Sequence, residues 1–360
     1  MTAKILLIDV DSKIPNLALM KLSRYYKEKG YLVELKKIGY SYYPHDKTCM
    51  VLVDEYNKVF VSTIFKINVG RISFIGKSDI INGGVGYDLN NKLSKEVEDL
   101  EPDYLLYPDN NISYGFITRG CIRNCEFCVV PKKEGLIHQV NTISKIVKHK
   151  KVKFLDNNIL AYRSHLDILA ELKDKKIRCQ FNQGLDIRLI NHNNAKLLSE
   201  LKYIGEYVFA FDDIKDKDQI EKGLLILKKY ILKDWKIKFY IYCNPCMDIQ
   251  EDVLYRINWC RKNKVLPYLM RDVSCWKSDK KDFYTDLCAY CNQPNMFKKL
   301  SFGQFMEKRT NNVQRQKESK RIYYSHKPKV EERPRLEETS EGRTSIPPTI
   351  KMAGILEVIL

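Results

Sequence analysis

Apolar runs of strand length alternate with a helical pattern in the first third of the chain. The runs lie at residues 5–10, 31–35, 59–65 and 71–75. Between the first two, residues 16–29 place apolar side chains at helical spacing and end before Gly30. Alternation of strand, helix and strand implies parallel pairing, so we predict a Rossmann-like α/β domain over residues 1–108. No G-x-G-x-x-G follows its first strand, so a dinucleotide-binding motif is missing.

The alternation becomes more regular from about residue 113. Six further apolar runs have the length of strands, at residues 114–118, 152–155, 179–181, 207–211, 239–243 and 267–270. Amphipathic helical stretches separate them, with a repeat of roughly 25–40 residues. This pattern favours an open, partial (β/α)6 TIM-like barrel over residues 109–305. In such barrels the residues that follow each strand form the active site.

The pattern stops after residue 305, and residues 306–360 are predicted to form a basic, disordered tail. No apolar run approaches the ~20 residues that a membrane-spanning helix needs. The first run is interrupted at Asp9, too early for a secretory signal. We therefore expect a cytoplasmic protein without a membrane partner. Thiols stay reduced in that compartment, so the 11 cysteines indicate metal or redox chemistry before disulfides.

The chain is basic, with 62 lysines and arginines against 45 aspartates and glutamates and a formal charge of +17. A basic surface attracts phosphates, which makes nucleic acid a candidate partner. The charge is spread over the body of the chain instead of being gathered in one block. Charge alone therefore leaves the partner open.

Three cysteines follow the first predicted barrel strand at the spacing C-x3-C-x2-C: Cys121, Cys125 and Cys128. Three thiolates within eight residues can wrap one compact inorganic core, and thiolates are the usual ligands of iron–sulfur clusters. A four-iron cluster would keep one iron without a ligand from this loop, where a substrate or cofactor can bind. Zinc with a distant fourth ligand is the alternative from the residues alone.

The motif, with Phe127 before its last cysteine, resembles that of the radical S-adenosylmethionine superfamily. The resemblance implies that the three cysteines hold a 4Fe–4S cluster whose fourth iron chelates S-adenosylmethionine. It implies reductive cleavage of that cofactor to a 5′-deoxyadenosyl radical, which abstracts hydrogen from a substrate that the sequence does not identify. It also implies a reducing partner such as flavodoxin or ferredoxin.

The layout of that family implies cofactor contacts after successive strands, here Phe127, Asp156, Asn157, Gln183, Asp186, Arg188, Asn244 and Arg271. Asp156 and Asn157 stand where many members have Gly-Gly-Glu, which this chain lacks, and a helix N-cap is their alternative role. Gln183 and Asp186 suit ribose or substrate hydroxyls, and Arg188 suits a carboxylate. For that segment a turn with a structural salt bridge is the alternative.

The N-terminal domain occupies the place where some members carry a cobalamin-binding domain. Those domains usually bind cobalt through a histidine in an Asp-x-His-x-x-Gly turn. The nearest histidine in this chain is His45, which lacks that pattern. We therefore predict a domain that resembles this fold without binding cobalamin.

The spacing C-x2-C recurs at Cys243–Cys246 and at Cys288–Cys291, with Cys275 between the pairs. A second metal site is one interpretation. Cys288 and Cys291 fall in a predicted helix without a glycine-rich knuckle, which favours ordinary buried thiols.

Two further functions compete. Thr118 to Cys121 resembles the approach to the motif in tRNA methylthiotransferases, which makes a nucleic-acid-modifying radical enzyme an alternative. Those enzymes carry a second, N-terminal set of cysteines and a C-terminal β-barrel, and this chain has neither pattern. The alternative from another class is a non-catalytic, metal-stabilised nucleic-acid-binding protein.

Overall fold

The computed structural model describes residues 3–40, 47–308 and 313–324, with no side-chain description for residues 313–316. The described residues form two compact units. Unit 1 runs to Phe209 and includes Gln219–Leu232; unit 2 contains Ala210–Asp218 and the residues from Lys233 onward. The boundary predicted at residues 108 and 109 therefore falls inside unit 1.

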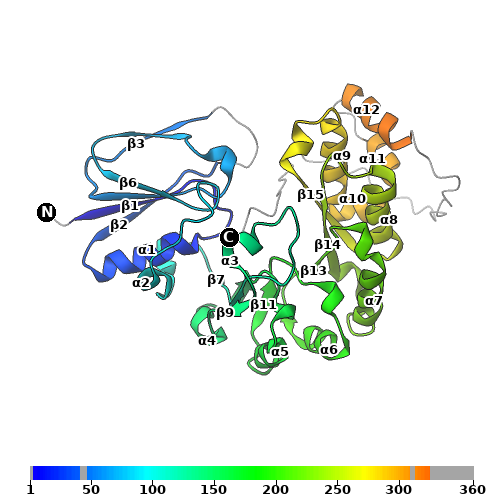
Figure 1. Cartoon of the computed structure of the whole chain (residues 1–360), viewed down its shortest axis with the longest axis horizontal. Coiled ribbons are helices and arrows are strands. Elements are labelled where there is room, and N and C mark those ends of the chain that lie inside the picture. The colour runs from blue at the N-terminus through cyan, green and yellow to red at the C-terminus, as the bar shows by residue number, and fades with distance from the viewer. Residues whose placement is uncertain (1–2, 41–46, 309–312, 325–360) are drawn as a thin grey trace, which may run out of the picture. The chain divides into compact units, whose positions relative to one another are not determined.

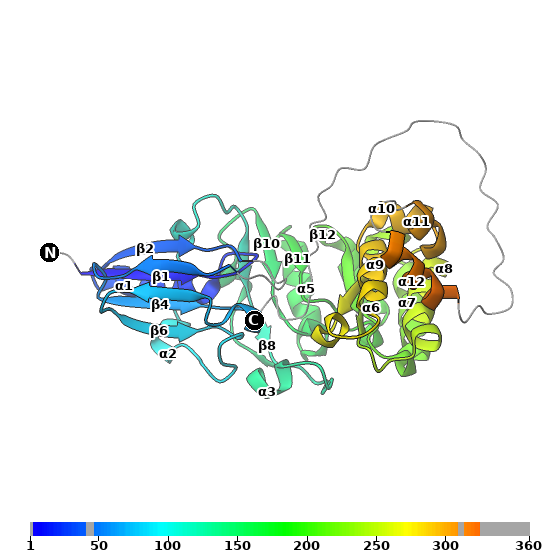
Figure 2. The same ribbon diagram turned by 90° about the horizontal axis from the view of Figure 1, so that it is seen from above.

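The N-terminal part of unit 1 is built on a parallel sheet with the strand order β2-β1-β4-β6 (Figure 2). Its strands are β1 (Lys4–Asp9), β2 (Leu32–Lys37), β4 (Lys58–Ser62) and β6 (Asp79–Gly83). Helix α1 (Leu17–Glu28) connects β1 to β2, and its N-cap Asn16 accepts a hydrogen bond from the Leu19 N–H. With α2 (Lys95–Glu98), it buries one face of the sheet.

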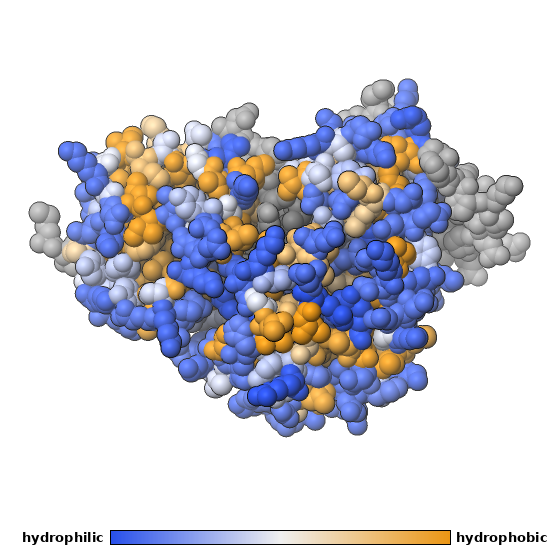
Figure 3. Space-filling model, viewed as in Figure 1, coloured by the Kyte–Doolittle hydropathy of each residue, from blue (hydrophilic) through white to orange (hydrophobic). Residues whose placement is uncertain are grey.

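The other face of this sheet is covered by strands instead of helices. β3 (Cys49–Leu52) and β5 (Ile72–Ile75) pair in parallel, and Val51 packs into a core with Ile8 and Val59. A doubly wound Rossmann fold would have helices on this face as well. Here the chain that forms β3 and β5 alternates with the period of a strand and has no amphipathic helical stretch. The outward side of the layer carries exposed Met50 (68%) and Leu52 (70%), and Figure 3 shows apolar side chains gathered on this part of unit 1.

A second parallel sheet of unit 1 has the order β12-β11-β10-β7. Its strands are β7 (Ser113–Gly115), β10 (Lys151–Phe154), β11 (Arg178–Phe181) and β12 (Lys202–Tyr203). Beyond β11, Leu185 bridges Phe209 of β13 (Tyr207–Ala210) in parallel. Helices α5 (His165–Asp174) and α6 (His192–Glu200) pack on each other (Figure 1). The chain after β7 forms an antiparallel pair, β8 (Thr118–Arg119) with β9 (His138–Gln139), and two short helices, α3 (Val130–Glu134) and α4 (Ile143–Ile146).

Unit 2 contains the parallel pair β14 (Ile237–Cys243) and β15 (Leu266–Arg271). Its helices are α8 (Tyr255–Lys262), α9 (Lys281–Cys291), α10 (Pro294–Lys299), α11 (Phe302–Lys308) and α12 (Val313–Tyr324), while α7 (Lys217–Lys228) begins in unit 2 and continues into unit 1. Shorter helical turns are η1 (Lys66–Asn68), η2 (Tyr104–Leu106), η3 (Ile159–Ala161), η4 (Ile187–Leu189), η5 (Ile214–Asp216), η6 (Asp234–Lys236), η7 (Ile249–Leu254) and η8 (Val273–Trp276).

The class of the fold agrees with the sequence. All six runs predicted as barrel strands contain a strand, and the larger sheets of the described residues pair in parallel, so the α/β class is confirmed. The partial barrel stays a prediction. Across the described residues, no helix combines the length and the apolar character that crossing a membrane requires.

One part of the predicted tail differs from expectation. Helix α12 lies within residues 306–360 and packs on α9, where the Ser319 hydroxyl donates to the Asp286 carboxylate at 2.8 Å. Both side chains are fully buried. The helix also packs on α11, where the ring centroids of Tyr323 and Phe302 lie 5.3 Å apart, so a few dispersed contacts hold a segment whose composition is mostly polar. Residues 306–308 form the end of α11, and residues 309–312 and 325–360 of the predicted tail lie outside the described residues.

Candidate functional site

The three motif cysteines lie on one loop whose two ends are held together. Cys121, Cys125 and Cys128 are partly exposed and stand between β8 and α3. The Cys121 N–H donates to the Gly135 carbonyl at 3.1 Å, and β8 pairs with β9 on either side of the loop. Gly120 has φ +85°, and a Cβ there would lie 2.4 Å from the Leu136 carbonyl oxygen. We call this closed base of the loop, where β8 pairs with β9 and Cys121 bonds to Gly135, its neck. The neck requires glycine at position 120.

A buried carboxylate stands at this neck. The side chain of Glu134, at the end of α3, is 3% exposed. Its Oε1 pairs with Arg119 at 3.0 Å, and its Oε2 accepts hydrogen bonds from the Gly120 N–H at 3.1 Å and from the Asn157 amide at 2.7 Å. Sequence reasoning missed Glu134. The sequence feature that could have pointed to Glu134 is its position directly before Gly135.

Asp156 follows β10 and is 1% exposed. Its carboxylate accepts hydrogen bonds from the Ile117 N–H at 3.2 Å, the Thr118 N–H at 2.5 Å and the Thr118 hydroxyl at 2.8 Å. Burial raises the pKa of this carboxyl to about 6. The structure thus uses Asp156 to hold the chain that enters the cysteine loop, and uses Asn157 to hold Glu134.

Asn158, the next residue, is the one in this run that lies beside a motif cysteine. Its amide nitrogen is 3.7 Å from the Cys121 sulfur and 3.4 Å from Asp186 Oδ2. The side chain is 4% exposed, and its carbonyl oxygen has no hydrogen-bond partner among the described residues. A buried acceptor without a donor costs about 1–3 kcal/mol, so this oxygen indicates a place for a donor from a ligand.

Two arginines flank Asp186, which follows β11 and is the N-cap of η4. Arg123, from inside the cysteine loop, reaches Asp186 Oδ2 at 2.8 Å, and Arg188 reaches Oδ1 at 2.7 Å. Burial acts to raise the pKa of Asp186, but the hydrogen bonds and charges of Arg188 and Arg123 outweigh it and hold the pKa below its usual range. Asp186 and Arg188 therefore form a salt bridge within the turn, as in the alternative interpretation of this segment. A second salt bridge, between Asp186 and Arg123, connects the turn to the cysteine loop.

The remaining predicted cofactor residues lie at different places. Phe127 is inside the loop, and Gln183 is in the turn after β11. Asn244 and Arg271 belong to unit 2, after β14 and at the end of β15. Asn244 Oδ1 accepts from the Cys246 N–H at 2.9 Å, and the buried Arg271 donates to the Thr285 hydroxyl at 2.8 Å. Both are thus engaged inside unit 2.

The donor set suits an iron–sulfur cluster in its chemistry. Three thiols lie within eight residues of irregular chain, and the Cys121 sulfur receives the Arg123 N–H at 3.3 Å as well as the Asn158 amide. Among the residues that the structure describes, no three side chains of Cys, His, Asp or Glu stand close enough together to hold a metal ion as they are. Binding would therefore have to draw the sulfurs together, as is usual where metal binding and local folding are coupled.

The cysteines of unit 2 have a different environment. Cys243, Cys260, Cys275, Cys288 and Cys291 are buried, and Cys246 is exposed. The Cys275 thiol donates to the Cys243 carbonyl at 3.5 Å, and the Cys288 thiol donates to the Leu269 carbonyl at 3.7 Å. Burial raises the pKa of Cys288 and of Cys291. These contacts favour the interpretation as buried thiols.

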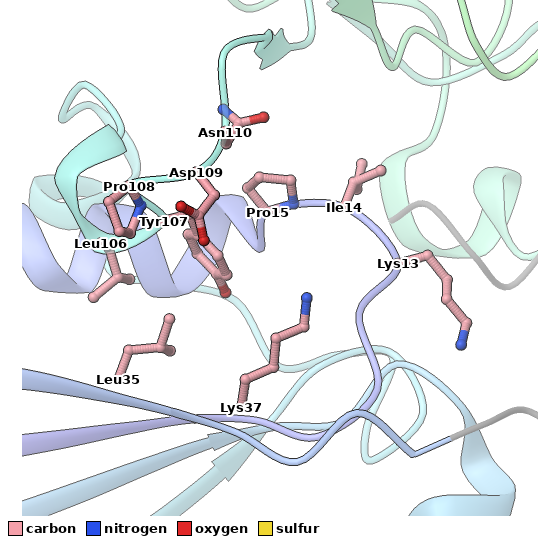
Figure 4. Close-up of a pocket in the computed structure, with 10 residues that line it drawn as sticks. All are labelled: Lys13, Ile14, Pro15, Leu35, Lys37, Leu106, Tyr107, Pro108, Asp109 and Asn110. Atoms are coloured by element: carbon pink, nitrogen blue, oxygen red, sulfur yellow. The ribbon is translucent and has the colours of Figure 1, made fainter.

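A cavity of about 380 Å³ lies in unit 1 at the carboxyl ends of β1 and β2 (Figure 4). The Lys37 side chain points into it, and Leu35, Tyr107 and Asp109 line it. The Tyr107 hydroxyl donates to the buried Asp9 at 2.8 Å. None of the motif cysteines lines this cavity. His45 lies outside the described residues.

No family model matches the chain, and no curated protein matches it. Two solved structures are similar to part of it. One is Streptococcus suis SuiB bound to the precursor peptide SuiA, with 16% identity over 45% of this chain and 39% of that chain, at a TM-score of 0.32. The other is Streptococcus suis SuiB bound to S-adenosylmethionine, with 15% identity over 45% of this chain and 40% of that chain, also at 0.32. This chain thus spans about two fifths of the SuiB length, and a likeness this low carries no functional argument.

Proposed function

We propose that this chain is a radical S-adenosylmethionine enzyme in which Cys121, Cys125 and Cys128 hold a 4Fe–4S cluster. One observation carries the proposal. The loop with three partly exposed thiols follows β7 of the parallel sheet and the short antiparallel strand β8. It is bordered by two buried polar side chains, Asn158 from the segment after β10 and Asp186 from the segment after β11. The carboxyl ends of parallel strands are where α/β proteins place their active sites.

When bound, the cluster would supply one electron to S-adenosylmethionine, giving methionine and a 5′-deoxyadenosyl radical that takes a hydrogen atom from the substrate. The residues of the chain would hold and orient the reactants. The three cysteines would bind as thiolates. The Arg123 N–H and the Asn158 amide donate toward the Cys121 sulfur, and such outer contacts tune a metal site.

Asn158 is the residue that we propose as acceptor for the ammonium group of the cofactor. Its unpartnered carbonyl oxygen is buried beside Cys121, whereas Asp156 is bonded to Thr118 and Asn157 to Glu134. The positive charge of Arg123 and Arg188 would favour the cofactor's carboxylate nearby. The open six-stranded barrel, a cytoplasmic location and a reducing partner such as flavodoxin or ferredoxin belong to this proposal. The substrate stays open.

The test is anaerobic reconstitution of the whole chain with iron and sulfide. The wild-type chain is expected to take up one 4Fe–4S cluster, visible in its absorption spectrum, and to release 5′-deoxyadenosine with dithionite and S-adenosylmethionine. Replacing Cys121, Cys125 and Cys128 together by alanine should reduce both to background while the circular dichroism stays that of a folded protein.

Cys246→Ala is the matched control, because it removes an exposed thiol of unit 2 and should leave iron uptake unchanged. A wild-type chain that binds zinc tightly and forms no 5′-deoxyadenosine would contradict the proposal. That result would favour the metal-stabilised nucleic-acid-binding alternative, especially if the triple variant also unfolded in part.

A further inference from the structure

We propose that Glu134 is a positioning residue that holds the neck of the cysteine loop in shape before any metal binds. It lies outside the C-x3-C-x2-C motif, six residues after its last cysteine. Its carboxylate is almost fully buried, at 3% exposure. A buried carboxylate is rarely tolerated without partners, and the identity of these partners assigns its role.

The contacts of Glu134 join three parts of the chain. Arg119 and Gly120 belong to the segment that enters the loop, Asn157 belongs to the segment after β10, and Glu134 itself ends the helix by which the chain leaves the loop. One carboxylate therefore ties the entrance of the loop, its exit and the neighbouring strand end together. Its bonds to the arginine and to the N–H are of the charge-assisted kind, which are the stronger hydrogen bonds.

The ion pair between Glu134 and Arg119 is the first of a series of ion pairs that extends to helices α2 and α1. Arg119 also reaches Glu98 of α2 at 3.4 Å, and its guanidinium lies 4.2 Å from the ring centroid of Phe116. Glu98 in turn pairs with Lys21 of α1 at 3.0 Å. Removing the Glu134 carboxylate would leave Arg119 paired with the more exposed Glu98 and would take away the acceptor of the Gly120 N–H and of the Asn157 amide.

This arrangement has a consequence for cluster binding. The three sulfurs are not gathered in the structure, so binding has to order the loop. A loop whose ends are already tied has fewer conformations to lose, and ordering it costs less free energy. The inference about the neck stands on the contacts of Glu134 alone. Its extension to cluster uptake rests on the proposed function.

The experiment compares Glu134→Gln and Glu134→Ala with Glu126→Gln. Glu126 is exposed and lies between Cys125 and Cys128, so its variant removes the same charge closer to the thiols without touching the neck. The readout is the alkylation rate of each motif cysteine in the metal-free chain, followed by mass spectrometry. Glu134→Ala is expected to raise these rates about tenfold because the loop opens more often, Glu134→Gln less, and Glu126→Gln less than about twofold.

A second readout is the iron and sulfide bound after reconstitution, which should fall for both Glu134 variants and stay at the wild-type value for Glu126→Gln. Unchanged alkylation rates in both Glu134 variants would overturn the inference, and so would an equal rise in Glu126→Gln, because charge alone would then explain it. A wild-type chain that takes up no cluster would contradict the proposed function. The alkylation rates would still decide whether Glu134 holds the neck.

Asn157→Ala covers the case in which the Glu134 variants fail to fold. It removes one of the three donors to Glu134 and leaves the ion pair with Arg119 in place. We expect Asn157→Ala to raise the alkylation rates of the motif cysteines above those of the wild type, by less than about tenfold. No rise would count against the positioning role.

Discussion

Cysteines at C-x2-C spacing occur in both units of this protein, in opposite surroundings. In unit 1, Cys125 and Cys128 are partly exposed on irregular chain whose neck is tied by Glu134. In unit 2, Cys288 and Cys291 are buried on one face of α9. A loop can rearrange to bring its sulfurs around a cluster, but a helix packed in a core cannot do so without losing its packing. Spacing therefore identifies candidates, and the surroundings decide between a metal site and core thiols.

The largest expected effect is on thiol reactivity. In the metal-free chain, Cys121, Cys125 and Cys128 should be alkylated by N-ethylmaleimide about 100-fold faster than Cys291, because burial raises the pKa of Cys291 and closes access to its sulfur. Mass spectrometry of the labelled peptides over time measures both rates. Cys246 is the control, since this exposed thiol of unit 2 should react at a rate close to that of the loop cysteines. Equal alkylation rates at Cys291 and Cys125 would contradict the difference in surroundings between the two pairs of cysteines.

The next effect is a dependence on pH that belongs to unit 1. The pKa of Asp156 is about 6 in the folded chain, above the ~3.9 of an unfolded aspartate. The stability that this raised pKa contributes is fully present below pH ~4 and is lost as the pH rises through about 6. Relative to Asp156→Asn, the wild type should therefore lose on the order of 3 kcal/mol between pH 4 and 7.

Denaturant unfolding at several pH values measures this difference. The three tryptophans, Trp235, Trp259 and Trp276, all belong to unit 2, so far-UV circular dichroism follows the whole chain while tryptophan fluorescence follows unit 2. Asp174→Asn, at an exposed carboxylate on α5, is the control and should show no such trend. A flat difference between wild type and Asp156→Asn would refute the assignment.

The smallest effect concerns the buried thiols. Cys291→Ser places a hydroxyl in a site of 1% exposure and should lower the free energy of unfolding of unit 2 by about 1–3 kcal/mol. Cys246→Ser, at an exposed site with the same spacing, should change it by less than about 0.5 kcal/mol. Tryptophan fluorescence in a denaturant titration measures both. If Cys291→Ser also lost iron after reconstitution, the thiols of unit 2 would have to be counted as ligands.

Local patterns of the sequence were enough to locate the six strands predicted for the barrel and the cysteine loop, but not the strands β3 and β6 of the N-terminal part. Each predicted barrel strand is a contiguous apolar run, and the loop follows the first of them, as the spacing indicated. The β3–β5 layer was not predicted as a layer of its own. Its strands have the right alternation, but which sheet a strand joins depends on partners far along the chain.

The polar contacts of the site were beyond sequence reasoning. Asp156, Asn157 and Asn158 are three adjacent residues of similar chemistry, and nothing local tells which one contacts Thr118, Glu134 or Cys121. These bonds join residues 23 to 38 positions apart. Propensity and spacing report on neighbours in sequence, so they identified Asp156 and Asn157 as candidates but did not single out Asn158 or assign the role of each residue.

The closed neck between Gly120 and Gly135 makes the cysteine segment an appendage with its own length. Because β8 and β9 pair at its base, residues added or removed between Cys128 and Glu134 need not shift the register of β7 against β10. That stretch can therefore change in length while the spacing of the three cysteines and the pairing of the sheet stay as they are.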